Sequence, residues 1–201
     1  MRADDQMNKL ELSDVLNFFE YEKVRDKWRA RVIAAKERRR VTVGPHLSFV
    51  FENRETVLFQ VQEMCRVERI ADDARIQDEL DVYNALLPRR GELSATLFIE
   101  IAEKSQVQPV LDRLMGIDVG RHVWLQVGKE FAVAGDFESG RSDEERGKIS
   151  AVHFVRFAFP SEAARAFRAE PAWLVVDHPA ERSRVAIEPG TKAALLEDLE
   201  G

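Results

Sequence analysis

Residues 52–70, ENRETVLFQVQEMCRVERI, decide the fold, because they predict one helix with an apolar face and a polar stripe. At about 100° per residue, the apolar face carries Val57, Val61, Met64 and Cys65. The opposite stripe carries Phe59, Glu63 and Arg66, and Gln60 lies at the edge of the apolar face. A large aromatic ring on a polar stripe needs cover from another element or from a partner. The stretch is therefore either an interior helix held by polar bonds or a binding surface.

Apolar residues also recur at helical spacing on both sides of this stretch. They predict a short helix over residues 12–19, a longer helix over 21–35 and a third helix over 73–87. The third helix follows residues 52–70 so closely that the two helices should form an antiparallel pair. A further short helix is predicted to begin at Ser105.

Alternating apolar side chains predict three hairpins, which span residues 41–51, 123–133 and 173–188. Two further strands are predicted over 93–101 and 149–159. The second of these is apolar on both faces, which indicates a central position in a sheet. The chain is therefore expected to be α+β, with a mainly antiparallel sheet, a helix-rich N-terminal half and a strand-rich C-terminal half.

The length and composition indicate an ordinary globular chain. A chain of 201 residues without a low-complexity linker predicts a single α+β domain over residues 1–201. A subdomain division near residues 103–118 remains open. The net charge of −6 argues against broad nucleic-acid binding, which needs a basic surface.

The sequence also restricts the cellular location that is expected for the protein. No apolar run approaches the roughly 20 residues that cross a bilayer, so no membrane association is expected. The N-terminus, MRADDQMNKLEL, is polar and acidic, unlike a secretory signal. A single cysteine, Cys65, excludes a disulfide within the chain and predicts a cytoplasmic location.

No standard catalytic motif occurs in the sequence. There is no phosphate-binding glycine loop, no G-x-S-x-G, and no H-E-x-x-H or E-x-x-H pair. Cys65 lies on the predicted apolar face with no base beside it, which indicates an unreactive core thiol. One cysteine is also too few for an iron–sulfur cluster or a thiolate zinc site. We therefore assign no catalytic residue, predict no metal and no cofactor, and favour a protein that is not an enzyme.

Two of the four histidines are candidates for a polar core. His153 shares a strand face with apolar residues, and a buried histidine must be paired or kept neutral. His122 lies on one face of the hairpin over 123–133. If the strands that carry His122 and His153 are neighbours, the two side chains can approach each other.

Three stretches resemble an uncharacterised bacterial family, domain-of-unknown-function family 3501. They are RRRVTVGPHLSFVFENRETVLFQVQEMCRVERI (38–70), ELDVYNALLPRRGELSATLFIEI (79–101) and RHVWLQVG (121–128). The family has no established activity, so the resemblance implies no catalytic residue. Its genes stand beside genes for rubrerythrin-like and iron–sulfur oxidoreductases, which implies a link to oxidative stress or electron transfer.

Two functions follow from these observations. The first is a non-catalytic accessory protein that binds a partner, with a redox protein as the implied class. The second is an enzyme or small-molecule binder with a polar cleft between the paired helices and the sheet. The residues expected to form the candidate surface or cleft are Phe59, Gln60, Glu63, Arg66, Tyr83 and Asn84. Association of the chain with copies of itself remains open.

Overall fold

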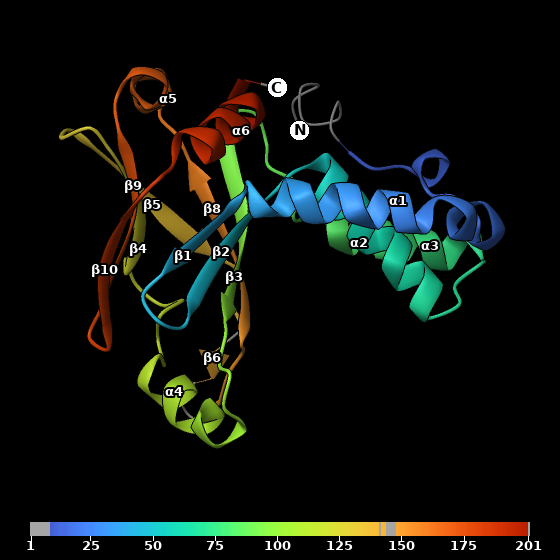
Figure 1. The fold of residues 1–201 in the computed structure, drawn as a ribbon, viewed down its shortest axis with the longest axis horizontal. Coiled ribbons are helices and arrows are strands. Elements are labelled where there is room, and N and C mark those ends of the chain that lie inside the picture. The colour runs from blue at the N-terminus through green and yellow to red at the C-terminus, as the bar shows by residue number, and fades with distance from the viewer. Residues whose placement is uncertain (1–8, 141, 144–147, 201) are drawn as a thin grey trace.

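A computed structural model describes residues 9–140, 142–143 and 148–200. It is α+β, with helices and strands interleaved along the chain (Figure 1). The α-helices are α1 (Phe18–Glu37), α2 (Arg54–Val67), α3 (Asp73–Asn84), α4 (Val107–Arg113), α5 (Ser161–Ala169) and α6 (Pro189–Glu200). Two short 3-10 helices are η2 (Leu12–Asp14) and η3 (Lys104–Gln106).

Eight strands form one antiparallel sheet in the order β1-β2-β3-β8-β5-β4-β9-β10. They are β1 (Arg40–Val43), β2 (Leu47–Glu52), β3 (Glu92–Ile99), β4 (Val123–Val127), β5 (Phe131–Phe137), β8 (Val152–Ala158), β9 (Ala172–His178) and β10 (Glu181–Ala186). A separate pair joins β6 (Ser142–Asp143) to β7 (Lys148–Ile149). The first and last strands of the order, β1 and β10, contact each other, so the eight-stranded sheet nearly closes.

The interleaved order bears on the expected division of the chain into two halves. Strands β1, β2 and β3 precede residue 100, and helices α4, α5 and α6 follow it. A helix-rich N-terminal half and a strand-rich C-terminal half are therefore not apparent. The expected α+β class and the antiparallel sheet are confirmed.

One apolar cluster fills the interior of the nearly closed sheet. The strands alternate as expected, and in β4 the inward side chains of Val123, Leu125 and Val127 are buried. Gly135 on β5 also faces inward, where a Cβ atom would lie 2.8 Å from the Val155 side chain. Only glycine leaves room for this contact between β5 and β8.

Helices cover the two ends of the sheet (Figure 1). Helix α4 lies at one end, where Val110 joins the interior cluster. Helices α5 and α6 lie at the other end, and Leu195 of α6 joins the same cluster. A buried ion pair fixes α6 to the start of β1, since Arg39 Nη2 lies 3.1 Å from Asp198 Oδ1.

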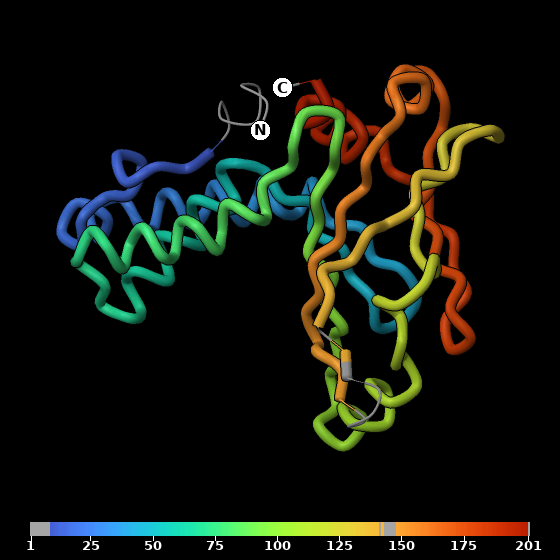
Figure 2. The backbone as a smooth tube through the Cα atoms, turned by 180° about the vertical axis from the view of Figure 1, so that it is seen from behind, coloured from blue at the N-terminus to red at the C-terminus, as the bar shows by residue number. Residues whose placement is uncertain are grey.

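Helices α1, α2 and α3 extend to one side of the sheet as a helical arm (Figures 1 and 2). Helix α1 contacts α2, and α2 contacts α3. The arm has its own apolar cluster, which contains Leu10, Val57, Val61, Cys65, Ile70, Leu80, Leu86 and Leu87. Among the described residues, no helix is both long and apolar enough to cross a membrane.

Side-chain caps start each helix of the arm. Asn17 accepts from the Glu20 amide, Asn53 from the Thr56 amide, and Asp72 from the Ala74 and Arg75 amides. The Asn17 cap begins α1 at Phe18, so the predicted helices over 12–19 and 21–35 are one turn of 3-10 helix followed by a single long helix.

Candidate functional site

The polar stripe of α2 packs against α1. Glu63 Oε1 accepts from the Tyr21 hydroxyl at 2.6 Å and from Arg25 Nε at 2.8 Å. Glu63 Oε2 accepts from Arg25 Nη2 at 2.9 Å, and Arg66 Nε lies 3.2 Å from Oε1. The hydrogen bonds from Arg25 are the main cause that lowers the pKa of Glu63 to about 2. Burial and the Glu63 carboxylate together raise the pKa of Tyr21.

Phe59 lies on the same stripe and is covered by α1. Its ring centroid is 6.0 Å from that of Trp28, and the Trp28 ring is 5.6 Å from Tyr21, both edge-to-face. The stripe of Phe59, Glu63 and Arg66 therefore contacts protein, through α1.

Gln60 belongs to a different cluster, which joins α2 to the sheet. Glu52, at the end of β2, is only 2% exposed. One carboxylate oxygen accepts from Thr96 Oγ1 of β3 at 2.7 Å. The other oxygen accepts from Thr56 Oγ1 at 2.5 Å and Gln60 Nε2 at 3.1 Å. The buried carboxylate is thus satisfied by neutral donors from α2 and from the neighbouring strand.

Asn84 holds the segment that precedes η2. Its side chain accepts from the Leu10 amide at 2.8 Å and donates to the Leu10 carbonyl at 3.0 Å. Gln62 of α2 binds Leu16 in the same two-way manner, at 2.9 and 2.8 Å. Both amide side chains are therefore used to fix the N-terminal segment on the arm.

Two members of the expected set line hollows: Tyr83 lines a groove beside the sheet, and Arg66 lines a separate cavity beside Phe18. This groove beside the sheet, of about 670 Å³, lies between the arm and the outer face of β3, β8 and β5. Its wall on the arm includes Met64, Glu79, Val82, Tyr83 and Leu86, and its wall on the sheet includes Ser94, Asp136, Phe154 and Arg156. A cleft between the paired helices and the sheet therefore exists. Gln60, Glu63, Arg66 and Asn84 are not among the residues that line it.

Arg156 sets the position of the arm beside this groove. Its Nη1 donates to the Leu87 carbonyl and to Glu92 Oε2, each at 3.1 Å, and its Nη2 donates to the Ala85 carbonyl. Carbonyl groups just after α3 therefore bind a cation from β8.

The two candidate histidines lie apart. Strand β5 separates β4 from β8, so the condition on which His122 and His153 could approach each other, that their strands are neighbours, is not met. His153 is fully buried, with Nε2 2.7 Å from the Ser150 carbonyl and Nδ1 3.4 Å from Asp118 Oδ2. His122 lies beside His178 instead, with ring centroids 5.0 Å apart.

His178 is the more constrained partner in that pair. Its Nδ1 accepts from the Ala180 amide at 3.2 Å, and its Nε2 lies 3.0 Å from the Met115 carbonyl. Because one nitrogen accepts and the other donates, this arrangement fits a neutral ring. Burial lowers the pKa of His178.

An exposed apolar patch lies on the segment from η2 to the start of α1. Figure 1 shows this segment at the end of the arm that is remote from the sheet. We call this patch, formed by Leu12, Leu16, Phe18 and Phe19, the arm tip. Phe18 is 48% exposed and Phe19 is 76% exposed, and their rings meet edge-to-face at 5.9 Å. A cavity of about 150 Å³ opens beside Phe18, between the N-terminal segment and helices α2 and α3. It is lined mainly by apolar side chains, including Leu12, Val15, Leu16, Ile70 and Ile76.

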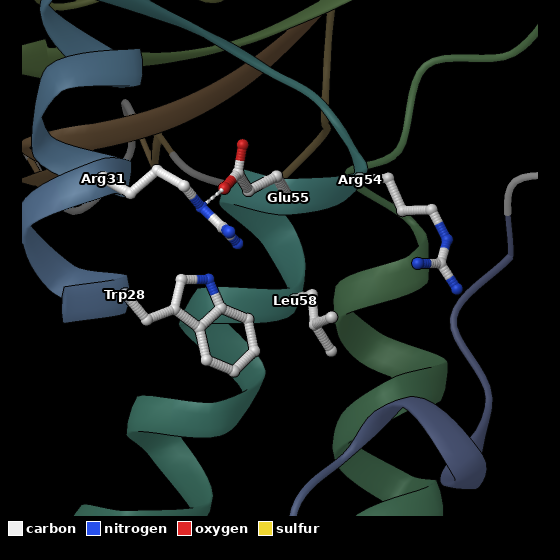
Figure 3. Close-up of a pocket in the computed structure, with 5 residues that line it drawn as sticks. All are labelled: Trp28, Arg31, Arg54, Glu55 and Leu58. Carbon is white, nitrogen blue, oxygen red and sulfur yellow. Dashed lines mark ion pairs between the residues drawn. The ribbon is translucent and has the colours of Figure 1, made fainter. Parts of the chain in front are cut away.

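A third hollow, of about 480 Å³, lies between α1 and the start of α2 (Figure 3). Arg31 forms an ion pair with Glu55 across it, and Arg54 Nη2 lies 2.6 Å from Asp14 Oδ2 of η2. Its charged groups therefore have partners within the fold. Across the described residues, no group of three His, Cys, Asp or Glu side chains is placed to hold a metal ion.

Sequence reasoning did not anticipate the exposure of the arm tip. The Phe18-Phe19 dipeptide was the available signal, because adjacent helical residues point about 100° apart and cannot both face one core. No sequence pattern indicated that Ser94 and Asp136 line the groove, because β3 and β5 are brought beside α3 only by folding.

Comparisons with known proteins show a relationship without a function. A solved structure from Burkholderia pseudomallei K96243, described as a novel protein of unknown function, has a TM-score of 0.87 and 36% identity to this chain. The match covers 96% of this chain and 100% of that one. No curated protein matches the sequence. Residues 9–199 match the family described as "Protein of unknown function (DUF3501)", and the chain therefore belongs to that family.

Proposed function

We propose that the protein is a non-catalytic accessory protein that binds a partner protein through the arm tip. The observation that carries this proposal is the exposed pair Phe18 and Phe19 beside an apolar cavity. Two phenylalanine rings in water cost free energy that a partner recovers by covering them, at about 25 cal/mol per Å² of apolar surface. Contiguous apolar patches of this kind are typical of interaction sites.

The position of the patch also favours this function. The segment that carries the arm tip lies at the end of the arm that is remote from the sheet (Figure 1). The cavity of about 150 Å³ has room for one apolar side chain from the partner. Aromatic anchors that fill such pockets supply much of the binding energy in protein interfaces.

The proposed partner is a redox protein of the rubrerythrin-like or iron–sulfur class. The link rests on the gene neighbours of family 3501, to which the chain belongs. A chain with one cysteine cannot hold an iron–sulfur cluster by itself. Its proposed role in such a cytoplasmic pathway is therefore to bind the electron carrier.

The test measures binding between the purified protein and a rubrerythrin-like protein of the same organism, by isothermal titration calorimetry. The variant Phe18→Ser/Phe19→Ser should weaken binding at least 100-fold, because it removes both aromatic anchors. Val119→Ser is the control, since Val119 is also exposed, at 55%, but belongs to the loop after α4. This control should bind like the wild type.

Two results would count against the proposal in different ways. If the wild-type protein binds and the double variant binds equally well, the arm tip is not the contact surface. If the wild-type protein binds neither a rubrerythrin-like protein nor an iron–sulfur oxidoreductase of the same organism, the partner class is wrong.

A further inference from the structure

The hollow between α1 and the start of α2 contains a buried hydrogen-bond donor that the fold leaves unused. Trp28 and Arg31 line this hollow from α1, three residues apart and on one face of the helix. Glu55 and Leu58 line it from α2 in the same way (Figure 3). The indole nitrogen Nε1 of Trp28 is buried, and within the described residues it has no hydrogen-bond partner. A buried N–H group normally has an acceptor, so this one indicates a bound acceptor.

Neighbouring rings fix the direction of this donor. The Trp28 ring meets the rings of Tyr21 and Phe59 edge-to-face, with centroid distances of 5.6 and 6.0 Å. Figure 3 shows the nitrogen edge of the Trp28 ring turned toward Arg31 and Glu55. Rotation of the ring to another direction would disrupt both aromatic contacts. The N–H group is therefore held toward the charged side of the hollow.

The charged pair beside Trp28 offers a second donor and an acceptor. Arg31 contacts Glu55 Oε1 through Nε, and Figure 3 shows the two Nη atoms of Arg31 turned toward the Trp28 ring. Glu55 Oε1 is buried, and although it is ion-paired, it accepts no hydrogen bond from the residues that the structure describes. The hollow thus places two N–H donors next to a carboxylate that can still accept.

The charges around the hollow are already balanced. Arg31 pairs with Glu55, and Arg54 pairs with Asp14 of η2. An anionic ligand would be repelled by Glu55 and would find no unpaired cation among these residues, and an ammonium group would be repelled by Arg31. A neutral group avoids both repulsions. A carboxamide is neutral and carries both an acceptor oxygen and N–H donors.

We infer that this hollow binds a neutral carboxamide on a short apolar stem. The carboxamide oxygen accepts from Trp28 Nε1 and from Arg31, and its nitrogen donates to Glu55. The stem contacts Leu58 and the Trp28 ring. The volume, about 480 Å³, lies within the ordinary range for small-ligand sites. The residues that line this hollow differ from those that line the cavity beside the arm tip, so the two sites are separate.

The test follows the indole N–H signals of the full chain by NMR during a titration with benzamide. The chain has three tryptophans, Trp28, Trp124 and Trp173, so two of the signals serve as internal controls. Benzamide should shift the Trp28 signal alone. Acetophenone has the same ring and carbonyl group but no N–H donor, and it should bind about tenfold more weakly because it cannot bond to Glu55. Benzoate should also bind more weakly than benzamide, because Glu55 repels it.

Two variants remove the donor and the acceptor in turn. Trp28→Phe keeps an aromatic ring but lacks Nε1, and it should raise the Kd for benzamide about tenfold, measured from the backbone amide signal of Leu58. Trp124→Phe on β4 is the matched control and should not change this Kd. Glu55→Met should abolish the preference for benzamide over acetophenone. Arg31 is 67% exposed and stays hydrated without its partner, so this variant should remain folded.

Two further arms identify the source of the amide and separate this proposal from partner binding. N-acetylglutamine methylamide that binds more tightly than benzamide identifies an amide side chain of a peptide as the natural ligand, and weaker binding identifies a free amide. Phe18→Ser/Phe19→Ser should bind benzamide like the wild type. A Trp28 signal that stays in place throughout the benzamide titration, or equal affinity for benzamide and acetophenone, would overturn the proposal.

Discussion

The best-connected single residue of the arm is Glu63. It binds Tyr21 and Arg25 of α1 and Arg66 of its own helix. Each bond involves a carboxylate, and hydrogen bonds to charged groups are worth about 1.5–3 kcal/mol. The charged stripe that could have served as a ligand site is therefore used to hold α1 on α2.

A substitution at Glu63 should change both stability and its pH dependence. Glu63→Gln should lower the free energy of unfolding at pH 7 by about 1.5–3 kcal/mol, measured by urea denaturation. The pKa of Glu63 is about 2 in the folded chain and about 4.5 when unperturbed. The unfolded chain therefore takes up the proton first, and this stabilisation is present above pH 4.5 and lost as the pH falls toward 2.

The difference between Glu63→Gln and the wild type should accordingly shrink over that pH range. Glu68→Gln is the control, because Glu68 is an exposed carboxylate at the end of the same helix. It should unfold like the wild type at every pH. A Glu63→Gln deficit that stays constant from pH 7 to pH 3 would contradict this account.

At the scale of elements, the joint between the arm and the sheet depends on polar groups from both sides. Glu52 binds α2 from the end of β2, and Arg156 binds the carbonyl groups after α3 from β8. Both helices that flank the groove are thus positioned by charged side chains of the sheet.

Removing the Arg156 contacts should loosen α3 without unfolding the sheet. In Arg156→Met, the carbonyl groups of Ala85 and Leu87 lose their donor. Hydrogen exchange at the amides of residues 76–87 should become at least tenfold faster, while amides inside β4 keep their rates. Arg165→Met, an exposed substitution on α5, should change neither set. Equal protection of residues 76–87 in Arg156→Met and in the wild type would exclude this role.

The elements also show what a sequence can predict. The three hairpins formed as expected, because each pairs strands that are close in the chain. The central position of β8 followed from its two apolar faces and is confirmed, since β8 lies between β3 and β5. The pairing of β8 with β3, and of β4 with β9, joins distant segments, and no local pattern specifies which strands meet.

The candidate site residues show the same limit. A local pattern gives the face of a helix on which a residue lies, but not the element that covers this face. The helical wheel placed Cys65 among buried residues and Phe59, Glu63 and Arg66 on the opposite stripe. It could not identify α1 as the cover of that stripe, because the cover depends on how distant helices pack. Tyr83 alone of the expected set lines the groove, whose other wall comes from β3, β8 and β5.

At the scale of the whole molecule, two apolar clusters share one chain. One fills the nearly closed sheet, and the other lies inside the arm. The chain crosses between them after α1, where Arg39 leads into β1. Arg39 also binds Asp198 of α6, so one ion pair joins the base of the arm, the first strand and the C-terminal helix.

This ion pair is nearly buried, with side-chain exposures of 6% for Arg39 and 9% for Asp198. Arg39→Met should lower the free energy of unfolding by about 3–5 kcal/mol at pH 7, because it leaves a buried carboxylate without its partner. Arg39→Met/Asp198→Leu should recover most of that loss, since no charge remains to be buried. Urea denaturation of the four proteins, including Asp198→Leu, measures the coupling between the two sites.

The pH dependence of Arg39→Met provides an independent check. Burial already raises the pKa of Asp198 in the presence of Arg39, and loss of the guanidinium should raise it further. In the folded variant, the Asp198 carboxyl then binds a proton more readily than it does in the unfolded chain. The free energy of unfolding of Arg39→Met should therefore fall as the pH rises above 3.8, the ordinary pKa of an aspartate. The deficit of Arg39→Met should therefore be smaller at pH 5 than at pH 7. A deficit that is equal at both pH values, with no recovery in the double variant, would mean that the cost comes from lost packing of the Arg39 side chain and not from the unpaired charge.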